Sequence, residues 1–315
     1  MPLPNDEKLL ALAQDLVQQL DTMFGLHPGF RPAHAKGTLL TGTFVPTAAA
    51  ASLSRAPHFS RASTPVTVRF SNSTGVPVLP DNDANADPRG FGLRFHLAER
   101  VHTDIIGHST DGFPTRTGKE FLEFLRALAG GSIETFLGSH PKALAFVQTP
   151  KPAPSSFARE KYFGVTAMHF TNTAGVSRYG RYRIVPEAGV EHLDKTAVAG
   201  RGANFLFDEL GERIAKGPIK FRLTVQLANE GDIVDDATIH WPEERTILDL
   251  GTLTLTQPVA EQEKEQKHII LDPIPRVDGI DPSDDPLLEL RAAVYLISGR
   301  RRRAAPETSA ATAGD

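Results

Sequence analysis

The sequence predicts an α+β protein in which short strands form an antiparallel sheet or barrel with helices attached to it. Segments with strand character recur along most of the chain and are interrupted by helical segments, without the regular strand–helix alternation of a parallel sheet. No internal repeat divides the chain, and its 315 residues are enough to bury one large core. We therefore expect one compact domain with a loose C-terminal tail.

The N-terminal half is predicted to contain two helices and four strands. From about Asn5 to Phe24, leucines recur on one face, which is typical of an amphipathic helix. Runs with strand character follow at 37–44, 66–71, 90–97 and 101–106. Apolar side chains at helical spacing over 121–128 then predict the second helix, and prolines between 141 and 154 predict an irregular connection.

The C-terminal half is predicted to contain further strands, at 167–172, 178–185, 219–228, 245–256 and 268–271. A helix over 203–215 separates two of them. A last helix carries Arg291 and Tyr295, and the acidic Asp284 and Asp285 just before it favour its N-terminus. The small, polar residues that end the chain predict a disordered tail.

Composition and charge exclude several classes of function. The net charge of −4 gives no reason to expect a nucleic-acid or anionic-membrane partner. The absence of cysteine excludes disulfides, thiol catalysis and metal or haem sites built on thiolates. We see no export signal and no apolar run of about 20 residues, so we expect no membrane span and predict a cytoplasmic protein.

A short motif near the C-terminus, Arg291-Ala-Ala-Val-Tyr295, has the spacing of two side chains on one helix face. A fixed positive charge beside a phenol favours the phenolate, which is otherwise scarce near pH 7 because tyrosine has a pKa of about 10. A phenolate is a hard, anionic ligand suited to ferric iron, and tyrosine ligation of haem is known. Alone the spacing is common, and the alternative is an ordinary helix with a surface arginine cluster at 300–303.

Further motifs occur in the first third of the chain: Arg31-Pro-Ala-His34-Ala-Lys-Gly37, Val68-Arg69-Phe70-Ser71-Asn-Ser and Asp87-Pro-Arg89-Gly-Phe91-Gly. Together with the C-terminal motif, this set resembles the haem catalase superfamily and is most similar to its short members, the catalase-related peroxidases. The resemblance extends from about Phe24 to Arg303, with further similarity at 204–210, 225–228 and 241–242. It implies an antiparallel eight-stranded catalase-type β-barrel with surrounding helices. The chain would then divide into an N-terminal helix (1–24), a haem-binding domain (25–303) and the tail (304–315).

The resemblance implies a role for each motif residue. His34 is expected above the haem, where a neutral imidazole can act as base and then as acid between the two oxygens of a peroxide. Ser71 matches the hydroxyl that orients this imidazole. Tyr295 is expected to bind the iron from below as its axial ligand, with Arg291 paired to the phenolate. Without the motifs, His34 is interpreted as a turn-capping histidine and Ser71 as a solvent-facing strand residue.

Three arginines, Arg31, Arg69 and Arg302, match arginines that contact the haem propionates or flank the pocket. A guanidinium suits carboxylates because its fork makes two parallel hydrogen bonds. Arg302 lies seven residues after Tyr295, about two helical turns, so both can face the same side. The other arginines of the 300–303 cluster are predicted to be solvated. We expect one haem b per chain.

One stretch departs from the large catalases, which carry a distal asparagine within Gly-Asn-Asn-Thr-Pro. The corresponding stretch reads Gly107-His108-Ser109-Thr110-Asp111, and we assign the place of the asparagine to Ser109. Strand alternation is expected to turn His108 away from Ser109. A serine hydroxyl would reach peroxide only in a different geometry or through a water. The long N-terminal arm and the C-terminal nucleotide-binding region of the large enzymes are not found either, so no bound NADPH is expected.

The function predicted from this resemblance is a haem peroxidase that reduces hydrogen peroxide or organic hydroperoxides with a small organic electron donor, with weak or no catalase activity. An alternative on the same fold is an enzyme like the allene oxide synthases, which isomerise a fatty-acid hydroperoxide. Those enzymes place threonine before the distal histidine, where this chain has Ala33. A non-enzymatic haem carrier or sensor is a third hypothesis, and His34 argues against it because storage needs no proton shuttle. The fold-level resemblance also hints at a homodimer.

Other patterns are weaker. The histidines at 96, 102, 169, 192, 240 and 268 show no tight metal-binding spacing, so a zinc or non-haem iron site is not expected. The acidic run at 281–285 lacks the twelve-residue pattern of a calcium loop. Gly90-Phe-Gly92 is not a dinucleotide-binding loop, because no helix with a third glycine follows it.

Overall fold

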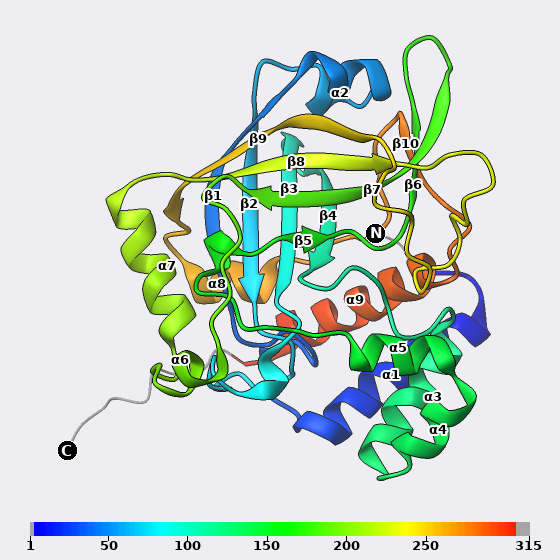
Figure 1. The fold of residues 1–315 in the computed structure, drawn as a ribbon, viewed down its shortest axis with the longest axis vertical. Helices are drawn as coiled ribbons and strands as arrows, with labels where there is room; N and C mark the ends of the chain where they lie inside the picture. Colours follow the sequence, from blue (N-terminus) through cyan, green and yellow to red (C-terminus); the bar gives the residue numbers. More distant parts are fainter. Residues whose placement is uncertain (1–2, 307–315) are drawn as a thin grey trace.

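Ten strands form one continuous antiparallel sheet in the computed structural model, which describes residues 3–306. Their order is β10-β6-β7-β5-β4-β3-β2-β1-β9-β8, and β8 also pairs with β7. This last pairing closes eight strands, β1 to β5 and β7 to β9 without β6, into a ring. The predicted eight-stranded antiparallel barrel with helices around it is thereby confirmed (Figure 1). β6 and β10 extend from the side of β7.

The strands of the described residues are β1 Gly37–Pro46, β2 Thr64–Ser71, β3 Gly90–Ala98, β4 Val101–His108, β5 Tyr162–Phe163, β6 Met168–Thr171, β7 Ser177–Pro186, β8 Ile219–Leu227, β9 Ile247–Pro258 and β10 Ile280–Pro282. The α-helices of the same region are α1 Glu7–Phe24, α2 Ala48–Leu53, α3 Gly118–Ala129, α4 Ile133–Ser139, α5 Pro141–Gln148, α6 Lys195–Ala199, α7 Phe205–Lys216, α8 Gln262–His268 and α9 Leu287–Ala304.

Most of the elements predicted from the sequence are present, and two predictions were wrong. The strand predicted at 268–271 is absent: α8 ends at His268, and the carbonyls of Ile269 and Ile270 accept hydrogen bonds from arginine side chains instead of a neighbouring strand. The irregular connection predicted at 141–154 contains α5. Pro141 stands at its start, where a missing N–H costs nothing. Residues 307–315 of the predicted tail lie outside the described residues.

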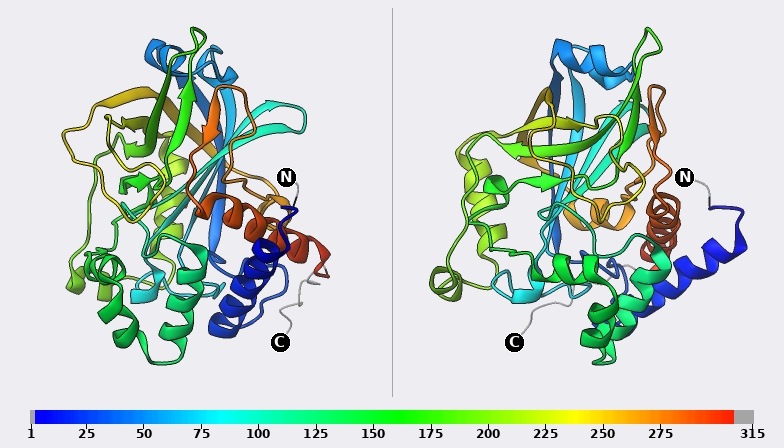
Figure 2. Two further views of the ribbon diagram at one scale, coloured as in Figure 1. Left: turned by 90° about the vertical axis from the view of Figure 1, so that its right-hand side faces the viewer. Right: turned by 45° about the vertical axis from the view of Figure 1, so that its right-hand side comes forward.

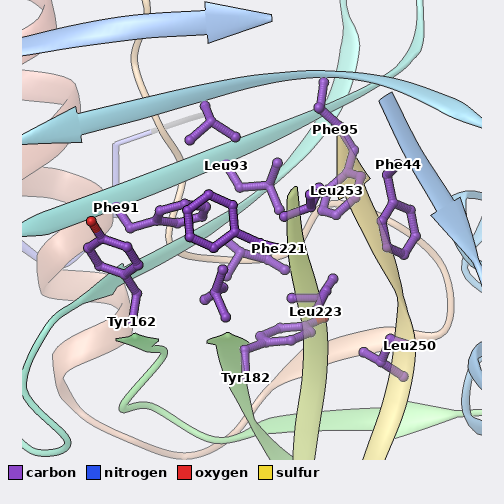
Figure 3. Close-up of a cluster of buried hydrophobic side chains, with 14 of the residues drawn as sticks. Phe44, Phe91, Leu93, Phe95, Tyr162, Tyr182, Phe221, Leu223, Leu250 and Leu253 are labelled. Atoms are coloured by element: carbon purple, nitrogen blue, oxygen red, sulfur yellow. The ribbon is translucent and has the colours of Figure 1, made fainter. Parts of the chain in front are cut away.

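The barrel core is built from alternate residues of its strands. Phe91, Leu93 and Phe95 of β3 point inward and are at most 2% exposed, and they pack against residues such as Phe44 and Phe221 from other strands (Figure 3). Because successive side chains point to opposite faces, the residues between them lie on the outside of the barrel. The outer face of β2 and β3 therefore carries the polar and glycine residues of the sequence motifs.

A helical layer covers part of this outer face. α1, α3 and α9 share a hydrophobic cluster, and α9 runs past the ends of β3 and β4 (Figures 1 and 2). Gly118 allows α3 to approach Leu290 of α9, since a Cβ at this glycine would overlap the leucine side chain. No helix within residues 3–306 is both long and apolar enough to cross a membrane. The motif residues therefore meet where the outer face of the barrel lies next to α9.

Candidate active site

The ends of β2, β3 and β4 align Ser71, Gly90 and His108 in one row. Ser71 is the register partner of Gly90, and Gly90 is the partner of His108. Partners on neighbouring antiparallel strands point to the same face, with Cβ positions about 4.5–5.5 Å apart. The row therefore presents a hydroxyl, a position without a side chain and an imidazole on the outer face of the barrel.

His34 lies over this row, in a loop just before β1. Its φ of 57° falls in the left-handed region, which is uncommon for a residue with a Cβ and costs roughly 1–2 kcal/mol. Main-chain hydrogen bonds hold the loop in place, from the N–H of His34 to the carbonyl of Ser73 at 2.7 Å and from Ala35 to Thr74 at 2.9 Å. A strained residue that its surroundings hold so firmly points to a functional position.

The Ser71 side chain contacts the His34 ring. The Ser71 hydroxyl lies 3.2 Å from Nδ1 of His34, and this contact leaves Nε2 as the nitrogen available for proton transfer. Burial, the positive charge of Arg69 and, more weakly, those of Arg31 and Arg291 lower the pKa of His34 to about 4, against an opposing hydrogen bond with the Asn72 main chain. The ring is therefore neutral at physiological pH and can accept a proton.

Gly90 is a site residue that was not predicted from the sequence. A Cβ built at Gly90 would overlap the Ser71 hydroxyl and come within 2.7 Å of Nδ1 of His34. The space that glycine leaves is occupied by the Ser71–His34 pair itself. The Gly90-Phe-Gly92 run is thus explained by alternation, with the phenylalanine in the barrel core and the glycines on the outer face.

We expect Gly90→Ala to displace the His34 ring and to lower peroxide turnover sharply, because the added methyl group enters the space of the Ser71–His34 contact. Overpacking of this kind usually destabilises a protein by about 1–3 kcal/mol. Turnover and thermal unfolding of the variant are the measurements. Gly138→Ala in α4 is the matched control, since a Cβ there meets no atom of residues 3–306 within 4 Å. Wild-type turnover of Gly90→Ala would refute the assignment.

A buried network fixes the chain on either side of the row. Asp81, which is fully buried, accepts a hydrogen bond from the Asn72 side chain at 2.8 Å, and its carbonyl accepts from Arg89 at 2.8 Å. Arg89 also donates to the Asn72 side chain. Since Asn72 follows Ser71 and Arg89 precedes Gly90, this network holds the two strand ends in register.

The second predicted pair, Arg291 and Tyr295, lies on α9. Nη2 of Arg291 is 3.4 Å from the Tyr295 phenol oxygen, and the guanidinium carbon is 5.8 Å from the centre of the phenol ring. The Arg291 charge also lowers the pKa of His34 and of His108, so it lies near both imidazoles. α9 thus places the Tyr295 phenol where this helix meets the outer face of the barrel. His34 and the row of Ser71, Gly90 and His108 lie at the same place, on the barrel side.

Arg31, Arg69 and Arg302 gather near this pair. Burial and the charge of Arg302 lower the pKa of Arg69 to about 9, and burial and Arg303 lower that of Arg302 to about 10. The pKa of Arg31 lies well below its ordinary value because of burial and then the charges of Arg69 and Arg302, while Tyr295 acts in the opposite direction. A guanidinium keeps its proton in proteins, so the three form a cluster of positive charge in which Arg69 and Arg302 are buried and Arg31 is half-buried.

The arginine cluster has neutral hydrogen-bond acceptors only, within the described part of the chain. Arg31 and Arg302 donate to the carbonyl of Ile269 at 3.1 and 2.7 Å, and Arg69 donates to the Gln266 side chain at 3.0 Å. Nε of Arg302 is buried and has no hydrogen-bond partner among residues 3–306. Buried charge without a counter-charge is costly, so the cluster suits a ligand with carboxylates. Among the other arginines at 300–303, which were predicted to be solvated, Arg301 forms an ion pair with Asp21 at 2.7 Å.

Ser109 was predicted to lie at the peroxide site, but its hydrogen bonds are made to the main chain of Arg89. Its hydroxyl accepts a hydrogen bond from the N–H of Arg89 at 2.9 Å, and its own N–H donates to the Arg89 carbonyl at 2.9 Å. Within residues 3–306, no hydrogen bond joins Ser109 to His34 or to Ser71. The residue that shares their face is His108, which was predicted to turn away from Ser109.

Comparisons with known proteins agree on one family. A family profile described as Catalase matches residues 28–309. A protein named Catalase-related peroxidase from Mycolicibacterium paratuberculosis is 35% identical over 88% of this chain and 90% of its own length. Another of that name from Synechococcus elongatus is 33% identical over 91% of this chain and 87% of its own length.

Solved structures show the same fold. A bacterial catalase superposes with a TM-score of 0.77 at 23% identity, and covers 95% of this chain and 62% of its own. Catalase A from Saccharomyces cerevisiae superposes with a TM-score of 0.78 at 21% identity, and covers 91% of this chain and 64% of its own. The chain therefore spans about three fifths of these larger proteins.

Proposed function

The chain belongs to the catalase family, and from this membership we propose that it is a haem-dependent peroxidase that reduces hydrogen peroxide and organic hydroperoxides with a small organic electron donor. Two relatives named Catalase-related peroxidase match it over nearly their whole length, which supports a peroxidase over a large catalase. The reaction takes up two electrons and two protons: a hydroperoxide and a reduced donor give the alcohol, water and the oxidised donor.

The arginine cluster is the observation that carries this proposal. Arg69 and Arg302, which are buried, and the half-buried Arg31 have no carboxylate partner within residues 3–306. They lie near a phenol that is paired with a fourth arginine, which suits one haem b per chain. Arg31, Arg69 and Arg302 would hold the propionates, and Tyr295 would be the axial ligand of the iron. Haem bound in this way supplies the redox-active iron at which the peroxide O–O bond breaks.

His34 moves the proton in the proposed reaction. With a pKa lowered to about 4, its imidazole is neutral and can take the proton from one peroxide oxygen. It then returns this proton to the other oxygen, which leaves as water or as an alcohol. Ser71 and the space over Gly90 hold the ring in position for both transfers. Arg291 stabilises the negative charge of the Tyr295 phenolate.

The test is to compare donor oxidation with oxygen evolution in the purified haem-loaded protein. We expect a Soret band, rapid oxidation of guaiacol with tert-butyl hydroperoxide, and slow release of oxygen from hydrogen peroxide. The absorbance of the oxidised donor and an oxygen electrode measure the two rates. Boiled protein and free haem at equal concentration are the controls.

Each other outcome identifies a different function. Rapid oxygen evolution with poor donor oxidation would make the chain a true catalase. Conversion of a fatty-acid hydroperoxide in the absence of any donor would indicate a rearranging enzyme. A Soret band that does not change on addition of peroxide would indicate a haem carrier.

A further inference from the structure

His108 occupies a position in the site that none of the proposed roles uses. It ends β4 and is the register partner of Gly90, which is in turn the partner of Ser71. A Cβ at Gly90 would lie between these neighbours and within 2.7 Å of Nδ1 of His34. The His108 side chain starts about 5 Å along the same row. Its ring therefore stands on the outer face, beside His34.

Hydrogen bonds assign the proton of the His108 ring. Nδ1 lies 2.7 Å from the Thr110 hydroxyl, and the N–H of Thr110 points at the same nitrogen at 3.4 Å. A main-chain N–H can only donate, so Nδ1 is the acceptor of the ring. Burial, the positive charge of Arg291 and the neighbouring His34 ring lower the pKa of His108 to about 3, against an opposing hydrogen bond with the Thr110 main chain, so the ring is neutral. A neutral ring with Nδ1 as acceptor carries its single proton on Nε2.

The two imidazoles of the site are therefore complementary. His34 has its Nδ1 bound by Ser71 and offers Nε2 for proton transfer, whereas His108 has its Nδ1 bound by Thr110 and offers an N–H. We propose that the Nε2–H of His108 donates a hydrogen bond to the small ligand held beside His34, and so positions the peroxide for the proton transfer. This inference rests on the proposed haem-dependent function, since haem would form the other wall of the site.

Cyanide binding to the ferric haem-loaded protein tests this role without turnover. His108→Leu should weaken cyanide binding by roughly two- to tenfold, the effect of one lost neutral hydrogen bond, and should shift the C–N stretching frequency of bound cyanide. His108→Asn keeps an N–H donor of shorter reach and should recover part of both. His102→Leu is the matched control, because it makes the same change on the same strand, β4, about 20 Å from His108.

The outcomes separate the inference from the proposed function. Full haem content with wild-type cyanide affinity and stretching frequency in His108→Leu would overturn the role of His108 and leave the peroxidase proposal intact. If the leucine variant takes up no haem, His108→Phe keeps a ring without the N–H and is measured in its place. A wild-type protein that binds no haem would overturn the proposed function, and this inference with it.

Discussion

Tyr295→Phe is expected to give a folded protein that binds little or no haem. The phenol oxygen is the only part of the side chain removed, and it is the atom that lies 3.4 Å from Arg291 and would bind the iron. Loss of residues that merely support a metal ligand commonly costs about 10–100-fold in affinity, so loss of the ligand itself should cost more. The ratio of Soret to protein absorbance after reconstitution with haem measures the effect.

Tyr179→Phe is the matched control for this prediction. Tyr179 lies on β7 with its ring against that of His169, and it is not one of the residues of the candidate site, so the variant should retain the full Soret band. Circular dichroism should show both variants folded, because each keeps the aromatic ring. A Tyr295→Phe variant with wild-type haem content and spectrum would remove Tyr295 as the axial ligand.

His34→Ala is expected to keep its haem and to react with peroxide about 10²–10⁴-fold more slowly, the usual contribution of a positioned acid–base group. The alanine cannot accept the proton of the peroxide, while the arginine cluster and Tyr295 are unchanged. The rate of the peroxide-induced change in the Soret band, measured by stopped flow, gives this first step directly. His169→Ala on β6 should react at the wild-type rate.

The pH dependence of the same step follows from the lowered pKa of His34. Its neutral form is the active base, so the rate should be flat from about pH 6 to 8 and should fall as the pH drops through about 4. A histidine with an ordinary pKa would instead lose activity below about 6.5. In His34→Ala the acid limb should disappear. Unchanged kinetics, or an unchanged acid limb, would exclude His34 as the base.

Ser71→Ala gives a second check on the assignment of His34. Ser71 acts through the His34 ring, which it contacts at 3.2 Å, so its loss should slow the wild-type protein and add nothing in the His34→Ala background. This non-additivity is what two residues in one hydrogen-bonded unit show. Independent effects of the two substitutions would mean that Ser71 contributes in another way.

Local patterns in the sequence were enough to predict most of the strands, the pairing of Arg291 with Tyr295 on α9, and which residues form the motifs. Arg291 and Tyr295 meet because four residues make about one helical turn, which is a property of the helix alone. The alternation within β2 and β3 likewise separated Phe70 and Phe91 of the core from residues of the outer face. The prediction of a strand at 268–271 was wrong because the hydrogen bonds of this segment depend on distant residues. Its apolar residues are typical of a strand, but the Ile269 carbonyl accepts hydrogen bonds from arginines that lie far away in the sequence.

Only the tertiary structure decided which side chains share the site. The row from Ser71 through Gly90 to His108 depends on register between three strands, and a shift of one residue would have presented Ser109 in place of His108. The need for glycine at position 90 depends on a loop residue, His34, that folds over it from 56 positions earlier in the chain. Helix and strand periods are short-range and can be read from a sequence. Register and close packing depend on contacts between distant segments, so they appear only in the folded chain.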